Sequence, residues 1–398
     1  MLAHKITLIP NNKQKTYLQK AVGVARFAYN WGLEQWGKQY NNHLADPVKN
    51  PKPSQYSLRR QLNSIKKEQF PWMIEVTKCA PQNALINLGK AFNNFFRKKA
   101  KYPKFHKKGI NDSFTLSNDQ FTLDGERIRI PNLGWVRMRE SLRFEGKIIS
   151  ATVSRAADKW FVSVNVETHD NSHLFKAENQ GAVGVDLGVS ALATLSTGEE
   201  VTGPKPHKVL LSRLKRYCRS LSRKVKGSKN RNKARERLAQ LHYRITCIRS
   251  DSLHKLTTDL TRRFHTIGIE DLNVRGMIRN RRLSRSIADM GFSELRRQLE
   301  YKAKMRGVQI MVADRFFASS KICSNCDHKV DNLKLSVRQW VCPACGEDHQ
   351  RDMNAAINLM KYAVSSTVLA CGEEGSGLKR KFGVKPASLK QEDSFEYI

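Results

Sequence analysis

Two closely spaced pairs of cysteines constrain the fold of this chain more than any other feature of its sequence. Two residues separate the members of each pair and fifteen residues separate the pairs, which are formed by Cys323, Cys326, Cys342 and Cys345. Four thiolates at this spacing are typical of a zinc ribbon, a small module that folds around one tetrahedral Zn²⁺ ion. Because four sulfur ligands leave no position open for a substrate, we expect one structural zinc ion.

The other cysteines indicate a reducing compartment. Eight cysteines in 398 residues are too few for a disulfide framework, and the four outside the pairs are scattered along the chain. His328 and His349 flank the paired cysteines, and we expect neither of them to bind the metal.

The charge of the chain predicts a polyanionic partner. Its 71 lysines and arginines exceed its 36 acidic residues by 35, while its 40% hydrophobic content is that of a globular protein. Such an excess of positive charge repels itself unless polyanions neutralise it, and the usual polyanion is nucleic acid. No apolar run approaches the ~18 residues of a membrane helix, and the first residues lack the layout of a secretion signal. We therefore expect a cytoplasmic protein with no membrane partner.

Hydrophobic periodicity divides the N-terminal half into helices and strands. Residues 5–10 alternate as a short strand, whereas apolar residues between positions 18 and 40 recur every three or four residues, as on one face of a helix. Two more helices are predicted at 58–68 and from Pro81 onward. Short alternating runs within 113–168, separated by Asn, Gly, Asp and Pro, predict a small β-barrel that the first strand would join.

Clusters of basic residues are the candidates for nucleic-acid contacts. The segment 97–108 contains seven lysines and arginines with two aromatic residues among them and no acid, which favours phosphate contacts combined with stacking on bases. The segment 213–237 contains twelve basic residues and one acid, and a third basic run lies at 275–285. A solvated surface without a partner is the alternative. The candidate residues are Lys98, Lys99, Lys101, Tyr102, Lys104, Phe105, Lys107, Arg216, Arg219, Arg223, Arg279 and Arg282.

Three acidic residues are the candidate catalytic groups. Asp186 and Glu270 each end a short apolar strand, and Asp352 opens a helix directly after the cysteine pairs. If the two strands are neighbours in a parallel sheet, their carboxylates meet at one edge and repel each other unless cations neutralise them. Two Mg²⁺ ions held there would activate water and stabilise the leaving oxygen during hydrolysis of a phosphodiester bond. Each acid alone is better explained by a capping or turn role, whereas the three in this order favour a metal site.

Several motifs resemble those of TnpB, a family of transposon-encoded proteins related to the type V CRISPR effectors. The motifs extend over nearly the whole chain, and the last two are the most specific in combination. They are Ala25-Arg-Phe-Ala-Tyr-Asn-Trp31, Tyr102-Pro-Lys-Phe105, Gly184-Val-Asp-Leu-Gly188, Gly268-Ile-Glu-Asp-Leu-Asn273, Ser319-Ser-Lys-Ile-Cys-Ser-Asn-Cys326, Cys342-Pro-Ala-Cys345 and Arg351-Asp-Met-Asn-Ala-Ala-Ile-Asn358. One departure is Gln350, where an acid is more often expected, but the three candidate acids are intact.

The resemblance implies an α/β multidomain protein that cleaves DNA under the guidance of an RNA. Its nuclease domain would be RuvC-like with an RNase H fold, and Asp186, Glu270 and Asp352 would be its catalytic residues and its ligands for two Mg²⁺ ions. The paired cysteines would form the zinc ribbon inserted in that domain. The implied domains are a β-barrel wedge domain at 1–10 and 103–178, a helical recognition domain at 11–102, the nuclease at 179–318 and 348–370, and the zinc ribbon at 319–347. The composition of 371–398, which is rich in Gly, Ser and Lys with little periodicity, predicts a flexible tail.

The resemblance also implies the partners. A noncoding guide RNA from the transposon end would pair with double-stranded target DNA beside a short adjacent motif, and the protein would act as a monomer near the nucleoid of a prokaryotic cell. The duplex would be recognised by its shape and backbone, because base pairing reads the sequence.

Two other functions remain open from the sequence. A guide-independent transposase or resolvase would use the same acids without RNA, and a non-enzymatic regulator would bind nucleic acid without needing Mg²⁺ or the acids. Only the family resemblance and the charge indicate RNA. A nuclease-dead regulator is expected to lack one of the three acids, so their presence favours an enzyme.

Overall fold

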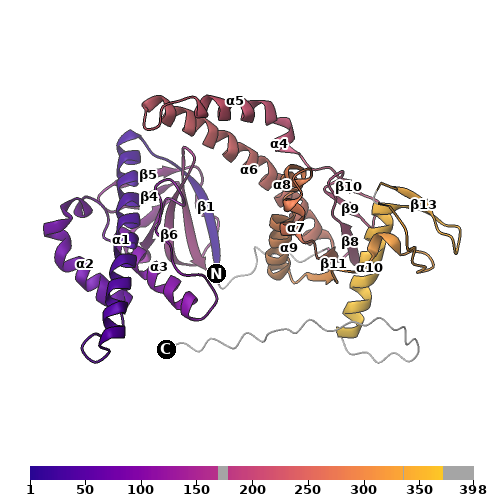
Figure 1. Ribbon diagram of the computed structural model, residues 1–398, viewed down its shortest axis with the longest axis horizontal. Coiled ribbons are helices and arrows are strands. Elements are labelled where there is room, and N and C mark those ends of the chain that lie inside the picture. The colour runs from indigo at the N-terminus through magenta and orange to yellow at the C-terminus, as the bar shows by residue number, and fades with distance from the viewer. Residues whose placement is uncertain (169–177, 335, 371–398) are drawn as a thin grey trace. The chain divides into compact units, whose positions relative to one another are not determined.

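The computed structural model describes residues 1–168, 178–334 and 336–370, which form two compact units (Figure 1). The N-terminal unit comprises the described parts of 1–176, 203–255 and 278–291, and the C-terminal unit those of 177–202, 256–277 and 292–398. The tail predicted at 371–398 lies outside the described residues. Among the helices of the described ranges, none is long and apolar enough to cross a membrane.

A seven-stranded antiparallel sheet forms the centre of the N-terminal unit. Its order is β2-β6-β7-β1-β5-β4-β3, so the first strand of the chain lies in the middle, between β7 and β5. Alternate side chains are buried, as in β4, where Ile128 and Ile130 are buried and the arginines are exposed. The strands are β1 Leu2–Ile9, β2 Ser113–Ser117, β3 Thr122–Asp124, β4 Arg127–Ile130, β5 Gly134–Met138, β6 Lys147–Ala156 and β7 Lys159–Glu167.

The predicted β-barrel is wrong, because this sheet is open. No ladder joins its edge strands β2 and β3 in the described part of the chain. A helix meets the β2 edge instead: the Asn83 side chain of α3 (Cys79–Phe96) donates a hydrogen bond to the Thr115 carbonyl oxygen at 2.9 Å. Alternation along a strand shows which face is buried, but it does not show what pairs with the backbone N–H and C=O groups of an edge strand. The sequence therefore could not distinguish an open sheet from a closed one.

Three helices share one hydrophobic core with this sheet. The first begins at a capping box, in which the side chains of Asn11 and Gln14 each accept a hydrogen bond from the other's backbone N–H at 2.9 Å. The periodic residues predicted for its inner face are buried from Leu18 to Trp36, which confirms that prediction. These helices are α1 Asn12–Ala45, α2 Gln55–Gln69 and α3 Cys79–Phe96, with short 3₁₀ turns η1 Pro71–Glu75 and η2 Asn118–Gln120.

A basic helical hairpin follows in the chain. Helix α5 (Leu211–Ser222) turns back into the long helix α6 (Lys229–Arg263), and Arg231 closes the turn by donating to the carbonyl oxygens of Leu221 and Lys224 at 3.0 and 2.7 Å. The buried Asp289 carboxylate accepts hydrogen bonds from two backbone N–H groups of a short neighbouring helix. The short helices of this region are α4 Pro206–Val209, α7 Val274–Arg279 and α8 Ser284–Met290.

A five-stranded mixed sheet forms the C-terminal unit, in the order β10-β9-β8-β11-β12. The three strands β8, β11 and β12 are parallel, whereas β9 runs antiparallel to β8 and to β10. The mixed α/β character expected from the sequence is confirmed. The strands are β8 Ala182–Asp186, β9 Ala193–Leu195, β10 Glu200–Val201, β11 Thr266–Glu270 and β12 Gln309–Ala313, and the helices are α9 Phe292–Arg306 and α10 Arg351–Ala370. The short elements η3 Ser319–Lys321, β13 Gln339–Val341 and β14 Asp348–Gln350 carry the paired cysteines between β12 and α10.

Two glycines allow α10 to lie directly on the parallel strands. A Cβ atom added to Gly184 in β8 would lie 1.8 Å from the Ala356 carbonyl oxygen, and one added to Gly268 in β11 would lie 2.3 Å from that of Leu359. Both contacts are with helix backbone, which cannot move aside as a side chain can. The helix that begins with Arg351 and Asp352 is therefore fixed across the two strands that end in the predicted catalytic acids.

Candidate active site and metal centre

The carboxyl ends of two neighbouring parallel strands hold two of the predicted acids. In the ladder between β8 and β11, Val185 lies opposite Ile269, and the next residue on each strand is Asp186 or Glu270. Both acids are partly buried. This placement satisfies the condition set by the sequence, that the two strands be neighbours with the same direction.

The third acid, Asp352, lies in the first turn of α10. Gln350, the residue that departs from the family pattern, accepts a hydrogen bond from the Met353 N–H at 2.8 Å and so caps the start of this helix. A glutamine gives that cap without adding a fourth negative charge near the three carboxylates.

The other two acids act electrostatically on Asp186. Burial, and after it the neighbouring carboxylates of Glu270 and Asp352, together raise the pKa of Asp186 to about 8, against the opposing effect of the Arg351 and Arg338 cations. Without a cation, Asp186 therefore retains its proton near neutral pH. A divalent cation would remove this repulsion and displace the proton, so oxygen ligands of this kind fit Mg²⁺.

Two of the acids have partners within the chain that the sequence did not indicate. Ser319 Oγ donates to Glu270 Oε1 at 2.6 Å, and Arg338 Nη1 donates to the two oxygens of Asp352 at 2.9 and 3.3 Å. The only sequence signal for Ser319 was its place in the motif that contains the first cysteine pair. Nothing in the sequence singles out Arg338. Among the described residues, the acids do not form a group of three with all ligand oxygens within 4.8 Å of one another.

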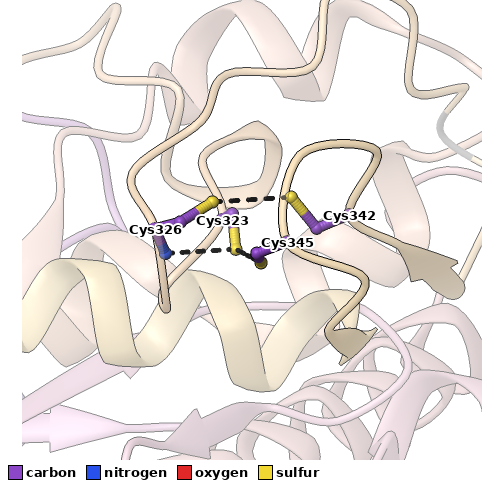
Figure 2. Close-up of side chains that lie close together, drawn as sticks. All are labelled: Cys323, Cys326, Cys342 and Cys345. Atoms are coloured by element: carbon purple, nitrogen blue, oxygen red, sulfur yellow. Dashed lines mark hydrogen bonds between the residues drawn. The ribbon is translucent and has the colours of Figure 1, made fainter.

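The four cysteine sulfurs form a compact cluster, as Figure 2 shows. All four lie within 4.8 Å of one another, and the Cys323–Cys345 and Cys326–Cys342 pairs are each separated by 3.6 Å. A tetrahedron with Zn–S bonds of about 2.3 Å has edges of about 3.8 Å, so the cluster has the size that Zn²⁺ requires. The backbone N–H groups of Asn325 and Cys326 lie 3.4 and 3.5 Å from the Cys323 sulfur, where they would stabilise a thiolate.

His349 is more closely involved in the cluster than its sequence position suggested. Its Nε2 atom lies 2.9 Å from the Cys323 sulfur, and its ring packs against Trp340 with the centroids 4.6 Å apart. With four sulfurs available for the metal, the imidazole is placed to donate a hydrogen bond to a Cys323 thiolate rather than to replace it as a ligand. The His328 side chain, by contrast, is exposed.

Replacing Cys342 with serine is expected to abolish zinc binding. The purified protein should contain about one zinc ion per chain, measured by elemental analysis, and the variant essentially none, because a hydroxyl is a poor substitute for a thiolate. His349→Ala should weaken zinc affinity by roughly 10- to 100-fold through the lost hydrogen bond. His328→Ala is the control and should retain full occupancy. A wild-type protein without zinc would reject the site.

The basic segment at 97–108 follows α3 and is held against α1. The backbone of His106 exchanges two hydrogen bonds with the Asn30 side chain, at 2.7 and 3.0 Å, and its ring stacks on Tyr29 with the centroids 3.8 Å apart. Tyr102 packs edge-on against Phe92 and Phe95, which leaves half of it exposed. The predicted lysines of the segment and Phe105 are exposed.

The other predicted nucleic-acid residues lie on or beside short helices. Arg216 and Arg219 are exposed on α5, Arg223 follows its last residue, Arg279 ends α7 and Arg282 lies in the turn before α8. All five side chains are exposed. Contacts with nucleic acid require this exposure, but a solvated surface without a partner would show it as well.

Comparison with known protein families identifies three regions of this chain. Residues 161–281 match a family described as a probable transposase, the OrfB proteins of IS605 elements, and residues 292–359 match a Cas12f1-like TNB domain. Residues 1–44 match a model described as a helix-turn-helix domain, although here they form β1 and most of the single helix α1.

Curated sequences include relatives that match this chain over nearly their full length. A Streptomyces pristinaespiralis protein named "Putative RNA-guided DNA endonuclease" is 36% identical over 98% of this chain and 96% of its own length. InsQ of Escherichia coli K12, which carries the same description, is 35% identical over 93% of this chain and 94% of its own.

Solved structures match with low scores. A Cas12f1–sgRNA–target DNA complex aligns with a TM-score of 0.32 and 14% identity over 90% of this chain and 99% of the other. CasPhi-2 bound to crRNA aligns with a TM-score of 0.43 and 11% identity over 91% and 98%. The family assignment therefore comes from the sequence relatives: the chain belongs to the TnpB family, the OrfB proteins of IS605-type transposons.

Proposed function

We propose that this protein is an RNA-guided DNA endonuclease that cleaves target DNA by two-metal hydrolysis of phosphodiester bonds. The observation that carries the proposal is the placement of Asp186 and Glu270 at the ends of neighbouring parallel strands, with Glu270 and Asp352 both close enough to raise the pKa of Asp186. The proposal is supported by relatives, matched over nearly their full length, that are named as such endonucleases. The strand order and directions support an RNase H-like, RuvC-type nuclease domain with the zinc ribbon inserted before α10.

In this proposal the three carboxylates hold two Mg²⁺ ions. The ions would supply an activated water molecule and neutralise charge on the leaving oxygen. Ser319 orients Glu270 through its hydrogen bond, while Arg338 neutralises Asp352 until the carboxylate is needed as a ligand. Because its pKa is raised, Asp186 would have to release its proton to solvent in order to hold a cation as a carboxylate.

The N-terminal unit would grip the guide RNA and the short motif beside the target. Its open sheet would act as the wedge domain and its helices α1–α3 as the recognition lobe, with the lysines of 97–108 on phosphates. The exposed arginines of α5 and of 279–282 would face the guide–target duplex, which is recognised by shape and backbone. One guide and one nuclease site suffice for a monomer.

Sequencing the RNA that copurifies with the protein tests the guide directly. Expressed together with its native flanking DNA, the protein should retain one discrete noncoding RNA that covers the transposon end. When that RNA is reprogrammed, Mg²⁺-dependent cleavage should follow the new target. A smear of cellular RNAs in proportion to their abundance would contradict the proposal and favour a guide-independent nuclease, and cleavage without Mg²⁺ would contradict the two-metal mechanism.

A further inference from the structure

The loop after β12 forms a cavity beside the proposed catalytic carboxylate Glu270. The cavity has a volume of about 210 Å³, and Glu270, Asp271, Arg315, Ser319 and Lys321 are among its lining residues. It is smaller than the ~300–1,000 Å³ pockets that enclose whole small molecules, so its size suits part of a larger ligand. The hydrogen bond from Ser319 to Glu270 makes the carboxylate part of the cavity wall.

Phe316 lies between two lining residues and is 90% exposed. Its position is fixed, because its backbone N–H donates to the Asp314 carboxylate at 2.9 Å and the N–H of Phe317 donates to the Asp314 carbonyl oxygen at the same distance. The ring of Phe317 packs against Tyr362 at 5.1 Å between centroids. The turn thus sends one phenylalanine into the fold and leaves the other in solvent, although aromatic rings are ordinarily buried.

Two cations lie on the same loop as this exposed ring and line the cavity. Arg315 donates to Asp271 through Nη2, yet 54% of its side chain is exposed. Lys321, at the other end of the loop, donates to the Asp331 carbonyl oxygen. Asp271 also accepts a hydrogen bond from Arg296 at 2.7 Å, so two arginines neutralise the acid that follows Glu270. Partial burial would raise the pKa of Asp271, but these two arginines hold it below its usual range.

We propose that this loop is a binding subsite for single-stranded nucleic acid, in which Phe316 stacks on a nucleobase of the strand being cut and Arg315 and Lys321 contact its phosphates. An exposed aromatic ring and cations on one loop are the combination that single strands bind. Stacking accepts any base, and a nuclease that takes its sequence from a guide needs contacts of this kind beside the catalytic site. The inference rests on the proposed function and adds a strand-positioning residue to it.

Binding of a single-stranded DNA that contains 2-aminopurine tests the subsite. The measurement uses the full chain with Asp186→Asn, so that the strand is not cut, and follows the fluorescence that stacking quenches. Adding Phe316→Ala is expected to weaken binding by about 5- to 150-fold and to remove the quenching. Phe316→Trp should restore both. Tyr301→Ala is the matched control, because Tyr301 is also a partly exposed aromatic beside an arginine, on α9.

The outcomes separate this subsite from the proposed function. Unchanged binding and quenching in Phe316→Ala would overturn the subsite even if guided cleavage is confirmed. Loss of both in Phe316→Ala, with zinc content and Tyr301→Ala unaffected, would support the subsite even if no guide RNA is found. An equal loss in Tyr301→Ala would also overturn it, because the effect would then not be local to the loop.

Discussion

Replacing Asp186 with asparagine is expected to lower the rate of guided DNA cleavage by about 10³-fold or more while the guide RNA remains bound. Asparagine has the size of the aspartic acid but supplies no charge to a cation. Metal ions in such sites contribute several kcal/mol to transition-state stabilisation, and each 1.36 kcal/mol corresponds to a factor of ten in rate. Single-turnover cleavage of a matched target and RNA retention on a filter measure the two properties. Full cleavage by the variant would remove Asp186 from the catalytic site.

The free energy of unfolding of the same variant is expected to depend on pH differently from that of the wild type. Without metal, the folded chain keeps the proton on Asp186 up to about pH 8, whereas the unfolded chain releases it near 3.8. The folded state thus binds more protons in this window, so the free energy of unfolding of the wild type falls as the pH rises from about 4 to 8. Asparagine does not titrate. The variant should therefore lose this part of the pH dependence and become more stable than the wild type in EDTA above pH 8.

Replacing Gly184 with alanine is expected to destabilise the C-terminal unit by about 3 kcal/mol or more. The added methyl group would lie 1.8 Å from the Ala356 carbonyl oxygen and 2.4 Å from the Met360 nitrogen, so α10 must shift away from β8. Overpacking of a core typically costs about 1–3 kcal/mol, and here the obstacle is backbone rather than a flexible side chain. Because the shift also displaces Asp352, DNA cleavage should fall together with the unfolding temperature of this unit, measured by calorimetry.

Gly23→Ala is the matched control for that substitution. Gly23 lies within α1 with nothing within 4 Å of the position of an added Cβ atom. Alanine is the better helix former by roughly 0.5–1 kcal/mol, so the same chemical change should stabilise the protein slightly. Equal effects at the two glycines would show that α10 does not depend on the close approach at β8.

The position of the two acids at the strand ends could be predicted because it follows from local sequence. Asp186 and Glu270 are the last residues of short apolar strands, and strand ends of a parallel sheet lie at one edge. The cluster of the four paired cysteines could be predicted in the same way, because their spacing alone is typical of a zinc ribbon. The residues that complete each site could not be predicted from local sequence. Arg338 reaches Asp352 and His349 reaches Cys323 only through the folding of the ribbon, and no spacing rule contains those contacts.

The same distinction explains the error about the barrel. The strands and the buried side of each were readable from alternation, as Ile128 and Ile130 show. Closure depends on whether the two edges meet, and here Thr115 at the β2 edge accepts a hydrogen bond from Asn83 of α3, which is 32 residues away in the chain. The cavity beside Glu270 also depends on such distant contacts, above all on those that Asp271 makes with Arg296 and Arg315.

The place of α10 in the chain has a consequence for the order of events on the ribosome. All seven strands of the first sheet lie within residues 2–167, so that sheet is complete before Asp186 is synthesised. The helix that covers Gly184 and Gly268 and supplies Asp352 is made last among the described elements. At roughly 5–20 residues per second, about 10–40 seconds separate the first acid from the end of this helix. A nascent chain therefore acquires its basic surfaces well before it can acquire the ability to cut.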